Sequence, residues 1–563
     1  MDDKTIIGID FGNSSTVIKI KNYSHGSNDN TSCESLQVDG HSAIPTLIFK
    51  REDDGRVFFG RKAEIEAAHN NGTLYKDFKT DLLHDDPEKR KQAEELTREY
   101  FKFLHQQFEA QESSLRVQAN KETYLSLPVK WPQCLYDFME KCAIDAGFGS
   151  KSTVKGEADT DAAVFAAFTN QEEDLKKLGV FCRNAPLNVM LLDLGAETCD
   201  ITIFRLLIDN DNIIHIGHGG ALISYSSVDS NTPCGGHAID GILIEYLETC
   251  LKRLSADGTL RRKSIELCRE TEKEWKEGIL SPRLAQNQSA PLPGGIMTHV
   301  EQLKDYGVFI DDSLPELTRS SFEMLSYHHW KQLHDLVQKA MKQAKKVIKG
   351  FQGPEDIDVI ILAGGHSQWY CVKELCLGRP VAGLPALNFS KIKESPYRLS
   401  MQTRPQETFA NGLVLRDLSM EVKQASPFNI WIRMRLDENA WSEIYQPVTL
   451  YEPLPVTKTI EWEYKTEAKS QYSLDNINLA CFVTRGVSLE TATVNKYEKM
   501  IGLNSLGGLL FKAAFAPIAI IVGNEAYIIK IRLDITIRED GKGSIKGVLS
   551  TSYNSGSTFF IEI

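Results

Sequence analysis

One short sequence pattern occurs twice in this chain, and it limits the folds that the chain can adopt. In residues 6–20 (IIGIDFGNSSTVIKI), two β-branched apolar runs flank Asp10-Phe11-Gly12 and the polar residues that follow. Residues 189–206 (VMLLDLGAETCDITIFRL) repeat this arrangement around Asp193-Leu194-Gly195. Apolar runs of this kind are typical of buried strands, so each copy predicts a tight hairpin. The internal repeat predicts two related lobes that face each other.

The first hairpin turn carries residue types that bind phosphate. Gly12 allows a close approach of the backbone, and Asn13, Ser14 and Ser15 offer small polar side chains. Asp10, at the end of the strand, is suited to hold Mg²⁺ through water. An apolar run that ends in D-x-G also closes ordinary hairpins, so the motif alone leaves both interpretations open. Two such turns on opposite sides of a cleft would bind the phosphates and the metal of one nucleotide from both sides.

Further candidates lie outside the hairpins. Lys79 either stabilises charge on a transferred phosphoryl group or is a solvated surface lysine. Asp159, in a run of carboxylates at the start of a small-residue helix, either caps the helix or orients an attacking water. Gly235-Gly236 precedes a helix, where backbone amides meet phosphate, although a plain loop-to-helix joint has the same pattern. Gly364-Gly365 ends a buried strand and would let a base or ribose lie against the backbone.

Charge and cysteine usage exclude several classes of protein. The net charge of −12 argues against a nucleic-acid binder or binding to an anionic membrane surface. The 11 cysteines show no C-x-x-C spacing, which is typical of reduced thiols in the cytoplasm. The N-terminus MDDKT is acidic and enters a strand at once, so we expect no signal peptide. Residues 509–523 are too short and too interrupted to span a bilayer, and we expect a cytoplasmic protein without a membrane span.

The length of 563 residues predicts two or three domains. We expect an α/β unit over residues 1–417, with lobe I at about 1–185 and lobe II at about 186–417. A short linker is expected at 418–425. From Ser426 onward, short alternating strands separated by glycine turns predict a mainly β, sandwich-like domain over residues 426–563.

Seven motifs together resemble the 70-kDa heat-shock chaperone (DnaK-like) family of the actin-like ATPase superfamily. In order, they are IGIDFGNSS at 7–15, DFK at 77–79, LLDLGAETCDI at 191–201, CGGHAID at 234–240, LTRSSFEML at 317–325, LAGGHSQ at 362–368 and RPQETFANG at 404–412. The resemblance covers about residues 1–417. It implies an actin-like ATPase fold of two duplicated ribonuclease-H-like lobes, followed by a β-sandwich that holds extended peptide.

The resemblance also implies ATP or ADP with Mg²⁺ as cofactors, and it assigns roles to individual residues. The residues implied in catalysis are Lys79, Asp159, Asp193 and Thr198. Those implied at the metal are Asp10, Asp193 and Asp200. Those implied at the nucleotide are Gly12, Asn13, Ser14, Ser15, Gly195, Ala196, Glu197, Gly235, Gly236, Lys276, Gly364, Gly365 and His366. The register of the adenosine-contacting helix leaves Lys273 and Lys276 as alternatives.

The chain departs from the family pattern in four respects. Ala196 and Glu197 replace two glycines of the second turn; a positive φ at Ala196 would cost on the order of 1 kcal/mol, and Glu197 would repel the γ-phosphate unless it turns away or meets the metal. Asp159 aligns with the family's helix-starting glutamate, with Glu157 as the alternative. His366 replaces a serine. The leucine-rich acidic linker and the helical lid are both missing from their expected places.

Three functions fit these patterns. The leading one is an ATP-binding, chaperone-like protein whose slow Mg-dependent hydrolysis controls lobe closure. Its β-domain would bind a polypeptide client or protein partner, and a co-chaperone or nucleotide-exchange factor would act on the lobes. The alternative is a nucleotide-gated scaffold that binds ATP and hydrolyses little of it. A small-molecule kinase of the same superfamily fits less well, because such kinases end soon after the adenosine turn.

Overall fold

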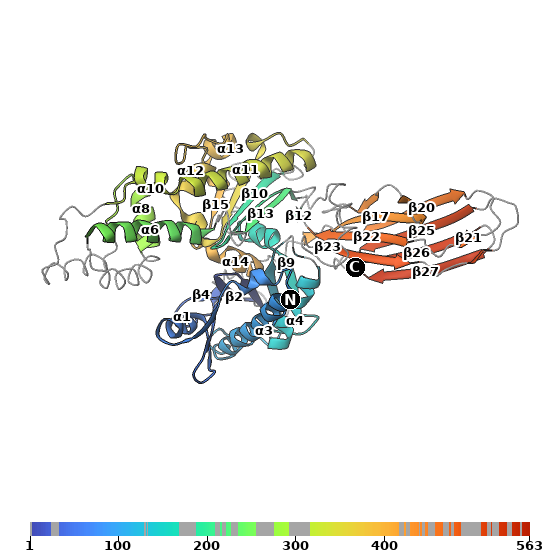
Figure 1. The fold of residues 1–563 in the computed structure, drawn as a ribbon, viewed down its shortest axis with the longest axis horizontal. Coiled ribbons are helices and arrows are strands. Elements are labelled where there is room, and N and C mark those ends of the chain that lie inside the picture. The colour runs from blue at the N-terminus through green and yellow to red at the C-terminus, as the bar shows by residue number, and fades with distance from the viewer. Residues whose placement is uncertain are drawn as a thin grey trace.

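The computed structural model has a mixed α/β fold (Figure 1), as the sequence predicts. The structure describes residues 3–23, 33–128, 131, 133–167, 187–208, 214–216, 221–226, 235–254, 275–291, 316–348, 350–415, 422–423, 428–437, 440–441, 445–448, 456–465, 472–473, 478–485, 508–514, 519–520, 528–537, 543–551 and 554–562. Within these residues, no helix is long and apolar enough to cross a membrane.

The first sheet is built on the first hairpin. Strand β1 (Lys4–Phe11) pairs antiparallel with β2 (Ser15–Tyr23) and parallel with β8 (Lys121–Leu127). The strand order is β3-β2-β1-β8-β9, with β4 joined to β2. The other strands are β3 (Glu34–Ser35), β4 (Ala43–Pro45) and β9 (Val154–Ala158). A small three-stranded sheet lies beside it, formed by β5 (Ile48–Arg51), β6 (Val57–Phe59) and β7 (Gly72–Tyr75).

The second sheet repeats the first in strand order and direction. Strand β10 (Leu187–Leu194) pairs antiparallel with β11 (Thr198–Ile208) and parallel with β14 (Val359–Ala363). Strand β13 (Ala221–Ser226) then pairs antiparallel with β11, and β15 (Leu399–Met401) pairs parallel with β14. The order β13-β11-β10-β14-β15 therefore matches β3-β2-β1-β8-β9. Both predicted hairpins are present, and each begins the same sheet topology.

Helices cover these sheets and bury two separate cores. In the first unit (described residues 3–158) they are α1 (Gly60–His69), α2 (Phe78–Asp81), α3 (Pro87–Glu109) and α4 (Gln133–Ala146). In the second unit (described residues 187–401) they are α6 (Gly236–Leu254), the π-helical turn η1 (Lys276–Leu280), α8 (Ser281–Ala285), α10 (Arg319–Leu325), α11 (Tyr327–Val347), α12 (Tyr370–Cys376) and α13 (Ser390–Glu394). Short 3-10 turns are η2 (Pro354–Asp356), η3 (Gly365–Gln368), η4 (Pro396–Arg398) and η5 (Pro405–Glu407).

A third core joins the two units. Helical residues 159–167 and α14 (Thr408–Val414) pack between the two sheets. This core contains Ile6 of β1, Val189 of β10 and Leu413 of α14. The two helices touch through their backbones, because a Cβ atom at Gly412 would lie 1.7 Å from the Ala162 carbonyl oxygen. The units are therefore connected through a tightly packed helix pair.

The C-terminal strands pair in antiparallel sheets, seen at the right of Figure 1. One sheet contains β17 (Phe428–Asp437), β18 (Ala440–Trp441), β19 (Tyr445–Val448), β22 (Asn478–Arg485) and β23 (Gly508–Ala514). The other has the order β20 (Val456–Lys465), β25 (Ile528–Ile537), β26 (Gly543–Thr551) and β27 (Asn554–Glu562). A two-stranded ladder joins β21 (Tyr472–Ser473) and β24 (Ala519–Ile520).

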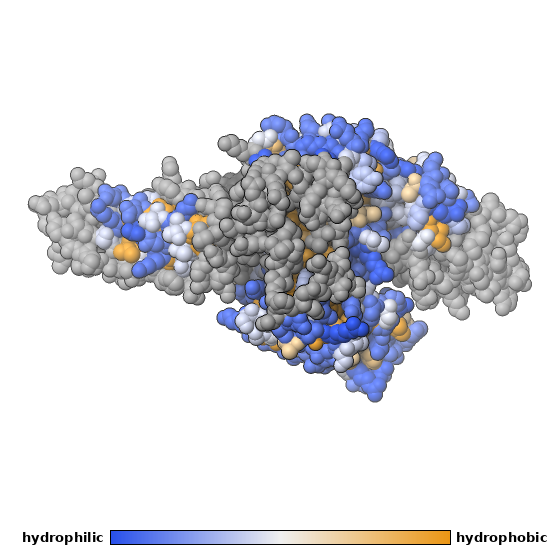
Figure 2. Space-filling view, turned by 180° about the vertical axis from the view of Figure 1, so that it is seen from behind, coloured by the Kyte–Doolittle hydropathy of each residue, from blue (hydrophilic) through white to orange (hydrophobic). Residues whose placement is uncertain are grey.

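Part of the predicted linker is a strand. Residues Val422–Lys423 form β16, which pairs in parallel with β12 (Ile214–Ile216) at the edge of the second sheet. The chain between the N-terminal units and the C-terminal strands is therefore tied to the second sheet at this point. On the face of the molecule that Figure 2 shows, the described surface is mainly hydrophilic, and its hydrophobic residues are scattered.

Candidate functional site

The two hairpin turns are closed by the same hydrogen bond. The Gly12 N–H donates to the Ser15 carbonyl at 3.1 Å, and the Gly195 N–H donates to the Thr198 carbonyl at 2.9 Å. A Cβ atom at Gly12 would lie 2.5 Å from the Ser15 carbonyl oxygen, so a side chain would break the first turn. Among the described residues, Ala196 is not one of the non-glycine residues with positive φ. The strain considered for Ala196 does not arise.

The first turn is supported by Thr46, a residue that the sequence analysis missed. Its hydroxyl donates to the Gly12 carbonyl at 2.9 Å, and its N–H donates to the Ser14 carbonyl at 3.0 Å. The side-chain oxygen of Asn13 is buried without a hydrogen-bond partner among the described residues. A buried acceptor of this kind favours a cation or a donor beside it. The turn therefore fits a hydrated metal ion near Asn13.

Lys79 lies in the site. Its ammonium group donates to the Phe11 carbonyl at 2.5 Å and lies 5.7 Å from the Phe11 ring centroid. It is also 5.3 Å from the Trp131 ring centroid. The side chain is half-buried and bonded to a backbone carbonyl, so it is not fully solvated, and its role in phosphoryl transfer stays a prediction. Lys79 thus brings a positive charge to the end of the first hairpin strand.

Carboxylates from both hairpins lie near this lysine. Burial raises the pKa of Asp10 to about 7; Lys79 opposes this rise and Asp159 adds to it. Burial also raises the pKa of Asp193 well above its usual value, and the charges of Asp200, Asp159 and Asp10 raise it further. The hairpin ends of the two units therefore face each other closely enough for their charges to interact. This excess of negative charge over one lysine favours the binding of a cation.

The residues predicted to bind metal do not converge on one point. Among the residues that the structure describes, no group of three or more His, Cys, Asp or Glu side chains has an arrangement that could hold a metal ion. Mg²⁺ usually keeps several waters and takes only one or two carboxylates. The arrangement of Asp10, Asp193 and Asp200 is therefore compatible only with an ion held largely through water, and their role as metal residues stays a prediction.

Asp159, rather than Glu157, is the carboxylate that faces the site. It begins helical residues 159–167 and accepts a hydrogen bond from the Ser126 hydroxyl at the end of β8. Its charge contributes to the raised pKa values of both Asp10 and Asp193. Glu157 lies within β9 and is buried.

The start of α6 packs directly on the second turn. The Gly236 N–H donates to the Gly195 carbonyl at 3.0 Å, and the His237 N–H donates to the Ala196 carbonyl at 2.8 Å. A Cβ atom at Gly235 would lie 2.2 Å from the Ala196 carbonyl oxygen. The close contact between helix and turn therefore requires glycine at position 235. The Gly236 amide is engaged by the turn, and contact of either glycine with phosphate stays a prediction.

Glu197 turns toward α6. Its carboxylate lies 3.1 Å from His237 Nδ1. The hydrogen bond from His237 lowers the pKa of Glu197 and raises the pKa of His237. We considered two ways for this carboxylate to avoid the γ-phosphate: turning away from it or binding the metal. In the structure it turns away. Burial and then the negative charge of Glu197 raise the pKa of Asp77 in the first unit.

Gly364 has the positive φ and the close approach expected of a backbone contact. Its φ is +76°, and a Cβ atom there would lie 2.3 Å from the Leu194 carbonyl oxygen and 2.8 Å from Asp193 Oδ1. Its N–H donates to the Pro405 carbonyl at 3.1 Å. Gly365 has open space around its Cβ position. The end of β14 is therefore fixed against the second hairpin, while Gly365 leaves room beside it.

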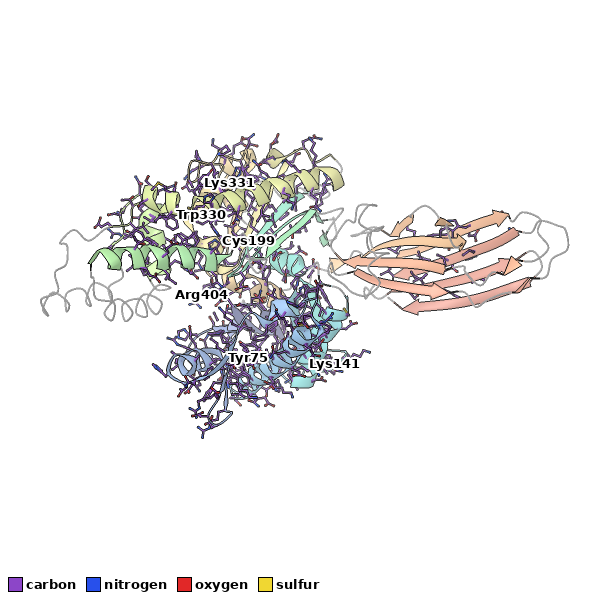
Figure 3. The ribbon with its side chains drawn as sticks, in the orientation of Figure 1. Tyr75, Lys141, Cys199, Trp330, Lys331 and Arg404 are labelled. Atoms are coloured by element: carbon purple, nitrogen blue, oxygen red, sulfur yellow. The ribbon has the colours of Figure 1, made fainter. Side chains whose placement is uncertain are left out.

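The segment after Gly364 also reaches the first unit. Glu407, at the end of η5, forms a buried ion pair with Lys19 of β2 at 2.6 Å. The Ser42 hydroxyl donates to Glu407 at 2.8 Å, and Arg404 lies 3.3 Å from the same carboxylate. Arg404 lies between the two units in Figure 3. Residues 404–407 thus hold the turn at Gly364 and the first sheet together.

His366 belongs to an aromatic cluster that the sequence analysis missed. Its Nε2 atom lies 2.8 Å from His329 Nε2, and its ring stacks parallel to Trp330 at a centroid distance of 5.8 Å. Burial lowers the pKa of His366 well below its usual value, and the charges of His329 and Lys276 lower it further, so the ring is neutral at pH 7. Trp330 appears in the second unit in Figure 3. The only sequence signal for this cluster was the amphipathic helix that carries His329 and Trp330.

Lys276 lies at the start of η1 and forms an ion pair with Asp240 of α6. Because its charge acts on His366, it lies on the side of the site expected for the nucleoside. Lys273 falls outside the described residues.

No protein-family model matches this chain.

Proposed function

We propose that residues 1–417 bind ATP with Mg²⁺ between two lobes of an actin-like ATPase fold, as in the 70-kDa heat-shock chaperone family, and hydrolyse it slowly to ADP and phosphate. The observation that carries this proposal is the repeated sheet topology, in which each copy begins with a D-x-G hairpin turn. The two lobes correspond to the first and second units. Interacting charges of Asp10, Asp159 and Asp193 support a site between the turns.

The side chains and turns present fit a nucleotide with a hydrated metal ion. The unpartnered oxygen of Asn13 and the crowded carboxylates both favour a cation. Ser14, Ser15 and Thr198 would contact phosphate, and Asp10, Asp193 and Asp200 would hold the metal through its waters. At the other end, Gly364, Gly365 and His366 would pack on the nucleoside, with Lys276 beside them.

Phosphoryl transfer to water needs positioning and electrostatic stabilisation more than covalent chemistry from the protein. Lys79, held at the first turn by the Phe11 carbonyl, would stabilise the negative charge that develops on the transferred group. Asp193, at the end of β10, would accept a proton from the attacking water, and Asp159 would orient that water. Bound Mg²⁺ supplies positive charge that offsets the phosphates and the carboxylates.

The C-terminal strands would bind a polypeptide client or protein partner through a strand edge. Within the described residues, β20 and β27 lie at the edges of one sheet, and β23 lies at an edge of the other. In β25, buried Ile531 and Leu533 alternate with exposed Lys530 and Arg532, so one face of that sheet is apolar and covered while the other is charged. Such a sheet offers its edges, more than its faces, for peptide binding.

The second candidate function is a nucleotide-gated scaffold that binds ATP and hydrolyses little of it. The observation that favours it is the second turn, where Glu197 replaces a family glycine and is held by His237. In that case the angle between the lobes would control a protein partner, and loss of hydrolysis would not affect binding.

The test is single-turnover hydrolysis of Mg-ATP by the full chain, measured beside ATP affinity. The variants are Lys79→Ala and Asp193→Asn, and Lys102→Ala, exposed on α3, is the matched control. Tight binding with turnover that falls at least tenfold in both variants, but not in the control, supports the ATPase. Tight binding without turnover supports the scaffold, and failure to bind Mg-ATP rejects both.

A further inference from the structure

One residue outside the hairpins, Thr46, binds two carbonyl groups of the first turn. Its hydroxyl donates to the Gly12 carbonyl at 2.9 Å, and its N–H donates to the Ser14 carbonyl at 3.0 Å. Thr46 is fully buried, so water does not compete for these bonds. We propose that Thr46 is a positioning residue for phosphate, because it fixes the turn in a conformation that leaves the Asn13 and Ser14 amides to the ligand. This role rests on the nucleotide binding proposed above, and Thr46 acts through the turn rather than on the ligand.

The pairing of β4 with β2 places Thr46 beside the turn. Pro45, the last residue of β4, pairs with Ser15, the first residue of β2, and Thr46 follows directly. From α3, the buried Tyr100 hydroxyl donates to the Pro45 carbonyl at 2.8 Å. The Thr46 hydroxyl also lies 3.0 Å from the Thr16 hydroxyl. The position of Thr46 is therefore fixed by β2, β4 and α3.

Other bonds engage two more carbonyl groups at the ends of the turn. The Phe11 carbonyl accepts a hydrogen bond from Lys79, and the Ser15 carbonyl accepts one from the Gly12 N–H at 3.1 Å. Carbonyl oxygens carry partial negative charge and repel a phosphate, whereas backbone N–H groups attract it. Together with the two bonds from Thr46, these contacts occupy carbonyl groups from one end of the turn to the other.

The amides at the tip of the same turn show the opposite pattern. Within the part of the chain that the structure describes, the N–H groups of Asn13 and Ser14 donate to no acceptor. Ser14 is exposed and Asn13 is half-buried, so a ligand can reach the turn. Adjacent backbone N–H groups of this kind form an anion-binding concavity. The bonds from Thr46 thus leave the donors of the turn available and its acceptors occupied.

The second turn is held in the same way by a different element. The Gly236 and His237 amides, at the start of α6, donate to the Gly195 and Ala196 carbonyls. In both copies of the hairpin, therefore, a segment distant in sequence binds the carbonyl groups of the turn. In the first copy, Thr46 supplies two of these bonds. The shared arrangement favours a role for Thr46 in ligand binding as well as in the stability of the hairpin.

The experiment compares a ligand that has phosphate with one that has none. The affinities of the full chain for Mg-ADP and for adenosine are measured by isothermal titration calorimetry. Thr46→Val keeps the N–H and the size of the side chain but removes the hydroxyl, so the Gly12 carbonyl loses its donor. We expect the affinity for Mg-ADP to fall about tenfold, the equivalent of one hydrogen bond, and the affinity for adenosine to stay unchanged.

Two further variants separate the position of the turn from general destabilisation, which would weaken both ligands alike. Thr46→Ser retains the hydroxyl and should bind Mg-ADP as the wild type does. Thr16→Val removes the other hydroxyl of the same buried pair, leaves the bonds to the turn carbonyls in place and should also keep wild-type affinity. Equal losses for Mg-ADP and adenosine in Thr46→Val, or an unchanged affinity for Mg-ADP, would overturn the role of Thr46.

A measurement on the wild type needs no variant to fold. Mg-ADP, but not adenosine, should slow hydrogen exchange in residues 12–15, because the phosphate engages the amides of the turn. Absence of this protection in a chain that binds Mg-ADP would overturn the role of Thr46 while nucleotide binding stands. A wild type that does not bind Mg-ADP at all would reject the nucleotide function itself, and the role of Thr46 with it.

Discussion

The crossing of helical residues 159–167 with α14 leads to a sharp prediction for Gly412→Ala. In an exposed helix this change stabilises by up to about 1 kcal/mol, because alanine is the better helix former. At position 412 the added Cβ would lie 1.7 Å from the Ala162 carbonyl oxygen and 2.6 Å from its carbonyl carbon. Carbon atoms do not approach an oxygen this closely, so the helices must move apart.

The magnitude follows from the packing around this crossing. Overpacking of a well-packed core costs about 1–3 kcal/mol, and more where backbone must shift. Movement of α14 also loosens Phe409 and Leu413, which belong to the core between the two sheets. After subtraction of the helix-propensity gain, we expect a net loss of about 2 kcal/mol. For units of this size that lowers the thermal midpoint by about 4 °C or more.

The assay is thermal unfolding of the full chain followed by tryptophan fluorescence. A chain of several units does not unfold in two states, so midpoints are compared rather than free energies. Gly241→Ala is the matched control, because Gly241 lies within α6 and has no atom within 4 Å of its Cβ position. We expect this control to raise the midpoint. Equal or raised stability in Gly412→Ala would refute the reasoning.

Three further predictions concern the contacts around Gly364. Gly364→Ala should lower the thermal midpoint by several degrees, because φ is +76° and the Cβ would lie 2.3 Å from a carbonyl oxygen. Glu407→Gln should lower the urea midpoint well below that of the wild type, because breaking a buried ion pair costs about 3 kcal/mol and Lys19 stays buried without its counter-charge. Burial alone would raise the pKa of Glu407, but hydrogen bonds from Lys19 and Ser42 lower it by more. The ion pair's stabilisation is therefore lost as the pH falls below 4.5. His366 must stay neutral, so the wild-type urea midpoint should fall as the pH drops below 6.5, and His366→Phe should abolish that fall in the same assay.

Local patterns in the sequence were sufficient to predict the two hairpins. Residues 6–20 and 189–206 each contain both strands and the turn between them, so register and turn follow from neighbouring residues. Gly364 was recognisable for the same reason, because a glycine pair after a buried strand indicates an unusual backbone conformation. For the two hairpins, the structure that forms depends on contacts within one short segment.

The remaining features depend on contacts between segments far apart in the chain. Thr46 supports a turn more than 30 residues before it, and His329 meets His366 across 37 residues. The direction of Glu197 depends on His237, 40 residues later. No local periodicity encodes such pairings. The strand at residues 422–423 was missed for the same reason, since β12 supplies its partner.

The cover over β1 has a consequence for synthesis of the chain. Gly8 lies against the Ala410 carbonyl and the side chains of Leu413 and Val414, and α14 packs across this side of the first sheet. A ribosome makes Gly8 about 400 residues before it makes that helix. For this whole interval the first sheet has one apolar face without its native cover, which exposes the nascent protein to aggregation. Closing so long a loop is slow, so packing of α14 on this face is among the last steps in folding of residues 1–417.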